Sequence, residues 1–158
     1  MREKTTPSFL FLRQILKKSP YFRQWPAQAF QEMVPFFRIA YYQKGEVFIH
    51  ENRRAPFLFI LGQGAVALSV RSGTGDLIIE ILKKKGDLLG WSALVAPRRY
   101  TASAKALSKV KALQIRGQDL ENYLRSRPHL GLLFWPKLAS LVASRLEQMR
   151  SLLLETMI

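Results

Sequence analysis

Between residues 36 and 116 the chain consists of short apolar runs separated by glycines, and this alternation restricts the fold more than any other feature. In AVALSV, residues 65–70, large apolar residues alternate with small ones, and LIIEIL, residues 77–82, repeats the pattern. The segment SGTG between them, residues 72–75, is typical of a hairpin turn. Many short strands joined by glycine turns are typical of a small antiparallel sandwich or barrel.

Helical patterns flank this region on both sides. Apolar residues follow a helical period within residues 8–33, where Pro26 marks the start of a short helix. Beyond the strands, residues 117–128 predict a short helix, and residues 129–158 predict a long one with a kink at Pro136. The sequence therefore predicts a single domain over residues 1–158, mainly β with flanking helices (α+β). Its parts are the helical residues 1–35, the β region 36–116 and the C-terminal helices 117–158.

The chain is strongly basic, with a net charge of +14 from 25 Lys and Arg against 11 Asp and Glu. A field of this sign favours anionic partners such as nucleotides, nucleic acid, acidic proteins or anionic lipid. The plainer alternative is a basic surface without a specific partner. The basic residues are scattered, which argues against one continuous nucleic-acid groove. Local clusters occur at Lys17-Lys18, Arg53-Arg54, Lys83–Lys85 and Arg98-Arg99.

The sequence lacks the residues and motifs that several classes of function require. The chain has no Cys, which excludes disulfides and thiolate metal sites and favours a reducing, cytoplasmic setting. Its two histidines, His50 and His129, do not have a metal-binding spacing. No Gly-x-Ser-x-Gly elbow and no Walker phosphate loop is present. No window contains the roughly 18 apolar residues of a membrane span, and the N-terminus lacks the features of a signal peptide. We therefore predict no enzyme, no metal, no cofactor and no transmembrane segment.

The stretch GDLLGWSALVAPRRYTASA, residues 86–104, is rich in small residues that expose backbone N–H groups. A single helical turn beginning near Trp91-Ser92 would direct free N–H groups at the preceding loop and attract an anion such as a phosphate. Arg98 and Arg99 are close enough in sequence to add charge-assisted hydrogen bonds. The alternative is that the glycines only turn the chain between two sheets.

The order of these segments resembles the cyclic-nucleotide-binding domain of the catabolite-activator and fumarate-nitrate-reduction regulator family, from about Phe22 to Leu146. The resemblance implies an antiparallel eight-stranded β-roll, jelly-roll-like, with N-terminal helices and a long C-terminal helix. It also places residues 86–104 on the family's phosphate-binding cassette. The family's recurrent turn positions are occupied by Lys44, Gly45, Glu46, Gly62, Gly64, Gly86, Asp87 and Gly90.

Two cassette positions depart from the cyclic-AMP-binding members of that family. At the position of Trp91, those members have a Glu that binds the ribose. At the position of Tyr100, they have an Arg that neutralises the phosphate. Thr101, whose hydroxyl would contact the phosphate, is retained. Arg99 stands one position early, and would face the other side of a regular strand. The predicted ligand-binding residues are Leu89, Gly90, Trp91, Ser92, Arg98, Arg99, Tyr100, Thr101 and Ala102.

These observations lead to one main hypothesis and two alternatives. The main hypothesis is a non-enzymatic sensor or regulatory module that binds a small anion, with a cyclic nucleotide as a weak ligand. The first alternative is a ligand-free β-roll that acts as a protein-interaction or dimerisation module. The second is an electrostatic binder of nucleic acid or acidic lipid. The sequence does not name the partner protein.

The predicted long helix carries an apolar seam at Val142, Leu146, Met149 and Leu153, spaced like the a and d positions of a coiled coil. It predicts a two-fold symmetric homodimer through residues 138–157, and the alternative is that the helix packs on its own β region. Arg145 is expected on a flank of the seam. Family regulators continue into a helix-turn-helix domain beyond this helix, and this sequence stops at Ile158, so sequence-specific DNA binding is not expected.

Overall fold

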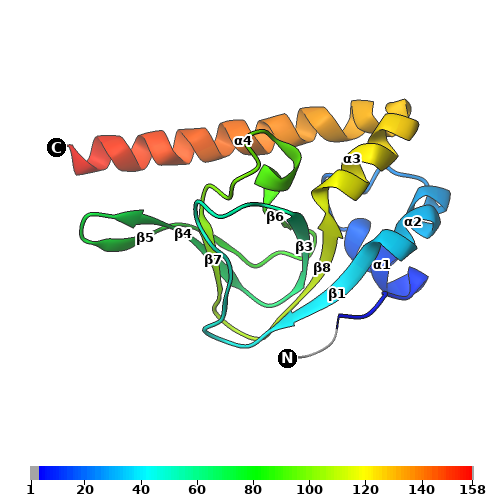
Figure 1. Cartoon of the computed structure of the whole chain (residues 1–158), viewed down its shortest axis with the longest axis horizontal. Helices are drawn as coiled ribbons and strands as arrows, with labels where there is room; N and C mark the ends of the chain where they lie inside the picture. Colours follow the sequence, from blue (N-terminus) through cyan, green and yellow to red (C-terminus); the bar gives the residue numbers. More distant parts are fainter. Residues whose placement is uncertain (1–3, 158) are drawn as a thin grey trace.

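The structure, a computed structural model, describes residues 4–157, and its strands form two antiparallel sheets rolled around a common core (Figure 1). One four-stranded sheet has the order β1-β8-β3-β6 and the other the order β2-β7-β4-β5. The predicted eight-stranded β-roll is confirmed. The strands are β1 (Phe37–Tyr42), β2 (Val47–Ile49), β3 (Phe57–Gln63), β4 (Val66–Ser72), β5 (Gly75–Leu82), β6 (Leu88–Leu89), β7 (Ser103–Ala106) and β8 (Val110–Arg116).

The predicted hairpin is formed by β4 and β5, which pair from Val66–Leu82 to Ser72–Gly75. The Ser72 hydroxyl donates a hydrogen bond to the Gly75 carbonyl at 2.6 Å and closes the turn. The tip of this hairpin extends beyond the roll (Figure 1). Ile78 and Ile81 are both exposed. The prediction that Leu77, Ile79 and Ile81 share one face is wrong for Ile81, because the register of the β4–β5 pair shifts between Leu68 and Ser69.

Helices cover one end and one side of the roll, as the flanking patterns predicted. The long helix begins at Pro128 and continues through Pro136, whose missing N–H leaves the Leu132 carbonyl without its helical donor. The helical elements are α1 (Phe9–Leu16), α2 (Ala27–Met33), η1 (Val34–Phe36), η2 (Trp91–Leu94), α3 (Gly117–Ser126) and α4 (Pro128–Thr156).

A cluster of buried aromatic rings joins the N-terminal helices to α3 and α4. The Trp25 ring centroid lies 5.0 Å from that of Phe22, 6.1 Å from that of Tyr123 and 6.3 Å from that of Phe134. Phe22 and Phe134 are also in contact, with centroids 5.4 Å apart. Because the first two of these rings are distant in sequence from the other two, the cluster fixes where α4 begins and in which direction it crosses the roll.

The start of α3 packs directly on η2, and a glycine makes this approach possible. A Cβ at Gly117 would lie 2.2 Å from the Ala93 carbonyl oxygen, a separation that no side chain tolerates. The Gly117 N–H donates to the Pro56 carbonyl at 2.9 Å. This contact fixes the position of η2, and therefore of the predicted cassette, relative to β3.

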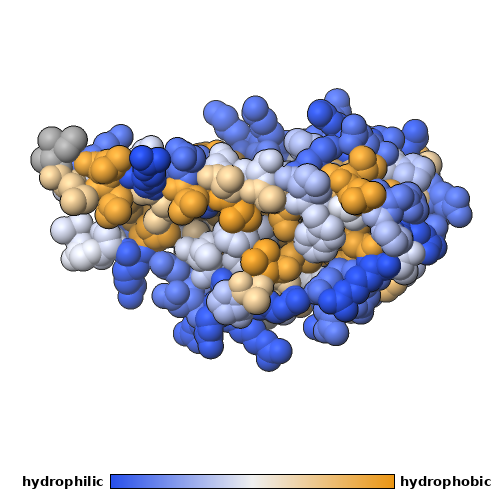
Figure 2. Space-filling model, turned by 90° about the horizontal axis from the view of Figure 1, so that it is seen from above, coloured by the Kyte–Doolittle hydropathy of each residue, from blue (hydrophilic) through white to orange (hydrophobic). Residues whose placement is uncertain are grey.

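Helix α4 has two different environments along its length. Its first half is packed on the core through Leu130, Phe134 and Leu138, whereas its second half extends over the β4–β5 hairpin (Figure 1). Apolar side chains lie along this second half on the outer face of the helix (Figure 2). Among them, Leu146 is 70% exposed and Leu153 is 62% exposed.

Replacing Phe134 with Ala should lower the free energy of unfolding by about 3–5 kcal/mol, because a fully buried ring leaves a cavity in the aromatic cluster. Leu132→Ala is the matched control on the same helix, since its side chain is 78% exposed, and it should change stability by less than about 0.5 kcal/mol. Urea denaturation of both variants measures the difference. Equal losses in the two variants would contradict the role given to the cluster.

Candidate functional site

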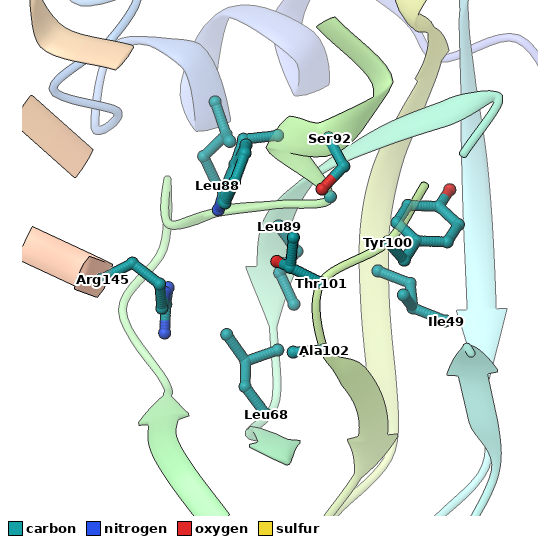
Figure 3. A pocket seen from close by; sticks show the side chains of 11 residues that line it. Ile49, Leu68, Leu88, Leu89, Ser92, Tyr100, Thr101, Ala102 and Arg145 are labelled. Carbon is teal, nitrogen blue, oxygen red and sulfur yellow. The ribbon is translucent and has the colours of Figure 1, made fainter. Parts of the chain in front are cut away.

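A small cavity lies at the cassette, and the chain brings most of the predicted ligand-binding residues to it (Figure 3). Seven of the nine line its wall: Leu89, Gly90, Trp91, Ser92, Tyr100, Thr101 and Ala102. The remaining wall is formed by Ile49, Leu68, Leu88 and Arg145. The free volume is about 20 Å³, which is room for one water molecule. Most of the predicted residues therefore surround one cavity, but that cavity is almost closed.

Gly90 shapes the top of the cavity. Its φ of 77° is left-handed, and a Cβ would lie 2.9 Å from the Phe57 carbonyl oxygen, so the position favours glycine on both grounds. The single turn predicted near Trp91-Ser92 is η2, in which the Ala93 N–H donates to the Gly90 carbonyl at 3.0 Å. Ser92 is buried at the start of this turn and points toward the cavity (Figure 3).

Tyr100 stands at the position where cyclic-AMP-binding members of the family have an arginine. Its ring fills part of the cavity and carries no charge. The side chain is buried, and its hydroxyl donates to the Phe57 carbonyl at 2.8 Å and accepts from the Phe57 N–H at 3.3 Å. Burial raises the pKa of Tyr100 above its ordinary value, and the hydrogen bond to Phe57 opposes the rise. The ring is thus neutral at physiological pH and anchored to β3.

The two remaining predicted residues, Arg98 and Arg99, lie outside the cavity wall. Arg98 donates to the Ala93 carbonyl at 2.9 Å and to the Glu121 carboxylate at 2.7 Å. Arg99 donates to the Asn52 carbonyl at 2.9 Å. Neither guanidinium supplies positive charge to the cassette cavity in this structure.

The positive charge comes instead from Arg145, which sequence reasoning placed on a flank of the helix seam. That expectation is wrong: Arg145 is only 7% exposed, and it extends from α4 toward the cavity (Figure 3). It follows the buried Leu138 by seven residues, or two helical turns, so the two side chains share the face that is turned to the roll. That spacing is the signal that could have identified it.

The buried Arg145 forms an ion pair with Glu80 of β5. Nη1 lies against the Glu80 carboxylate oxygen Oε2, and one carboxylate cannot accept from all five N–H groups of a guanidinium. Tyr21 and Asp87 lie near the pair. Burial raises the pKa of Tyr21, with Asp87 and Glu80 adding to the rise and Arg145 opposing it. The guanidinium is therefore compensated in charge but retains hydrogen-bonding capacity at the cavity.

No group of three or more His, Cys, Asp or Glu side chains that could hold a metal ion occurs among residues 4–157. Within the same residues, no helix is long and apolar enough to cross a membrane.

Glu80→Gln should lower the free energy of unfolding, because it leaves Arg145 buried without an anionic partner. Removal of one partner of a fully buried pair costs about 3–5 kcal/mol. Since Glu80 is 30% exposed, we expect about 1–3 kcal/mol here. Adding Arg145→Met should recover part of the loss, as a double-mutant cycle measures. Glu147→Gln, at an exposed carboxylate of α4, is the control, and strictly additive effects at positions 80 and 145 would contradict the pairing.

A family model described as "Cyclic nucleotide-binding domain" matches residues 39–127, more than half of the chain. Among solved structures, a cyclic nucleotide-binding protein from Geobacter metallireducens superposes with a TM-score of 0.71 at 25% identity, over 85% of this chain and 97% of that one. The N-terminal domain of a transcriptional regulator from Streptomyces coelicolor gives a TM-score of 0.66 at 25% identity, over 87% and 92% of the two chains. The predicted resemblance is confirmed.

A third structure shares the fold at lower identity. It is the regulatory subunit of a cAMP-independent protein kinase A from Trypanosoma brucei, in a variant with three substitutions that is bound to cAMP in its A site. The TM-score is 0.75 at 18% identity, and the match covers 94% of this chain and 54% of that one. None of the curated proteins matches this chain.

Proposed function

Because the chain belongs to the cyclic nucleotide-binding domain family, we propose that it is a non-enzymatic regulatory module that binds a small anion in the cassette cavity. One observation carries this proposal: the guanidinium of Arg145 is buried in the cavity wall, and its ion pair with Glu80 leaves it further N–H donors there. A buried cation with spare donors is a ready partner for a phosphate group.

Arg145 would serve the phosphate in place of the arginine that the family has where this chain has Tyr100. A guanidinium can donate two parallel hydrogen bonds to two oxygens of one phosphate. The hydroxyls of Ser92 and Thr101, which also line the cavity, can donate to the same oxygens. Each hydrogen bond to a charged group contributes about 1.5–3 kcal/mol, so Arg145 would contribute the largest share of the binding energy.

A ligand can enter only if the cavity opens. Sites for nucleotide-sized molecules have about 300–1,000 Å³, far above the 20 Å³ that is free here. Arg145 would exchange Glu80 for the ligand, and α4 or the β4–β5 hairpin would move with it. This opening consumes binding energy, so cyclic AMP is expected to bind weakly.

A protein of this fold need not respond to cyclic AMP. The Trypanosoma brucei regulatory subunit is described as cAMP-independent, and it is bound to cAMP in its A site in a variant with three substitutions.

The closed cavity also favours a second candidate function, a ligand-free module that acts through protein contacts. Tyr100 and the pair of Arg145 and Glu80 fill the space that a nucleotide would need. The exposed apolar face of α4 is the surface through which such a module would act, and we propose a second copy of the chain as its partner.

Calorimetric titration of the protein with cyclic mono- and dinucleotides separates the two candidates. We expect cyclic AMP to bind more weakly than about 1 μM, and Arg145→Gln to weaken binding at least tenfold, since it removes the cation. The pair Trp91→Glu and Tyr100→Arg should strengthen cyclic AMP binding. Arg23→Gln, at an exposed arginine, is the charge-matched control. If no member of the panel binds, or if both glutamine variants lose binding equally, the ligand-binding proposal fails.

Replacing Leu146 and Leu153 together with Glu should convert a two-fold symmetric dimer into a folded monomer. Burial of an apolar side chain contributes about 1.5–3 kcal/mol, so several of them can offset an association cost of about 4–15 kcal/mol. Val142 and Met149, the other two seam residues, are half-buried and are left unchanged. Sedimentation equilibrium measures the mass. An unmodified protein that is already monomeric at high concentration would refute the dimer.

A further inference from the structure

A second basic site lies outside the cassette cavity, where η2, α3 and the start of β3 meet. Arg54, Arg98 and Arg116 surround a hollow of about 390 Å³ whose floor is formed by Ala55, Pro56 and Ala93. An adjoining hollow of about 340 Å³ lies between Arg98 and Arg125. The two share Arg98 and Gln118, so they form one continuous site that is far roomier than the cassette cavity.

Positive charge dominates this site. Four guanidinium groups, of Arg54, Arg98, Arg116 and Arg125, face a single carboxylate, that of Glu121. Glu121 accepts from both Arg98 and Arg125 at 2.7 Å, and the Arg98 hydrogen bond is the main reason why its pKa lies below its ordinary value. The carboxylate is therefore ionised at neutral pH. Asp119, in the first turn of α3, shares a neighbouring hollow with Arg116, and two positive charges remain in excess when both carboxylates are counted. This excess attracts an anion that carries more than one negative charge.

Two of the arginines are held in place before any ligand arrives. Arg98 adopts a left-handed backbone with φ of 58° and donates to the Ala93 carbonyl as well as to Glu121. The Arg116 guanidinium lies over the Phe57 ring, 5.4 Å from its centroid. Side chains that are ordered in advance lose little entropy on binding, which favours a specific site over a diffuse surface charge.

The start of α3 adds donors to the same site. This helix of ten residues has no side-chain cap at its N-terminus, and the Gly117 N–H is already bound to the Pro56 carbonyl. The next N–H groups, beginning with that of Gln118, have no partner within the helix. They add to the positive potential of the hollow that Gln118 lines.

We propose that this pair of hollows binds the pyrophosphate group of a small molecule such as a nucleoside diphosphate. One phosphate lies between Arg54 and Arg116. The other lies beside Arg98 and Arg125, on the side away from the Glu121 carboxylate that these two guanidinium groups already bridge. Two adjoining hollows with a shared arginine match two linked phosphates better than one. The site is separate from the cassette cavity, so the inference stands or falls independently of the proposed function.

Titration calorimetry with inorganic pyrophosphate at physiological ionic strength tests this site, with orthophosphate and a nucleoside diphosphate in parallel. We expect pyrophosphate to bind at least tenfold more tightly than orthophosphate. The double variant Arg54→Ala and Arg116→Ala should weaken pyrophosphate binding at least tenfold. The double variant Arg13→Ala and Arg23→Ala removes the same charge from exposed positions elsewhere and should leave it within about twofold. Arg145→Gln, in the cassette cavity, should also leave it unchanged.

Amide chemical shifts of the unmodified protein provide a readout that does not depend on any variant. On addition of pyrophosphate, we expect the largest changes at residues 54, 98 and 116–118 and small ones at residues 88–92. Three results would overturn the inference: equal losses in the two double variants, equal affinity for orthophosphate, or shifts centred on the cassette. An oligonucleotide that competes more tightly than the nucleoside diphosphate would also overturn it, in favour of nucleic acid.

Discussion

Arg145 carries a full positive charge to a position that is only 7% exposed, and the arrangement of the cassette depends on how that charge is compensated. Its partner, Glu80, belongs to the β4–β5 hairpin, so one ion pair connects the long helix to the hairpin beside the cavity. While the pair is intact, the helix, the hairpin and the cavity wall are held together. In the function that we propose, an anion in the cavity would compete with Glu80 for Arg145, and ligand binding would thereby be linked to the position of α4.

Strand and turn patterns allowed a small antiparallel β fold to be predicted because each depends on local geometry, and the resemblance to a known family implied the β-roll. The hairpin followed from the alternation on either side of residues 72–75, and the turn at Trp91-Ser92 followed from its small neighbours. Strand β6 has only two residues, Leu88 and Leu89, and is too short to show a period. Seven of the nine cassette residues that the family resemblance suggested line one cavity, whereas Arg98 and Arg99 lie outside it.

Side-chain partners could not be predicted in the same way, because they depend on how elements rotate against each other. The sequence shows that Arg145 is helical, but the aromatic cluster around Trp25 and Phe134 sets the face that it presents to the roll. Likewise, the left-handed backbone at Arg98 directs its guanidinium to Glu121 rather than to the cassette. Because the Arg98 guanidinium points away from the cassette, it becomes part of the basic site beside α3. Residues of η2 line both the cassette cavity and this basic site.

The most direct test of this account is a crystal structure of the protein grown with saturating cyclic AMP. The account predicts a phosphate within hydrogen-bond distance of the Arg145 guanidinium, about 2.7–2.9 Å, and Glu80 displaced from its pair. Serine and threonine hydroxyls from Ser92 and Thr101 should complete the contacts. A cavity that remains closed over an intact Arg145–Glu80 pair, or a phosphate bound in the cassette without Arg145, would contradict it.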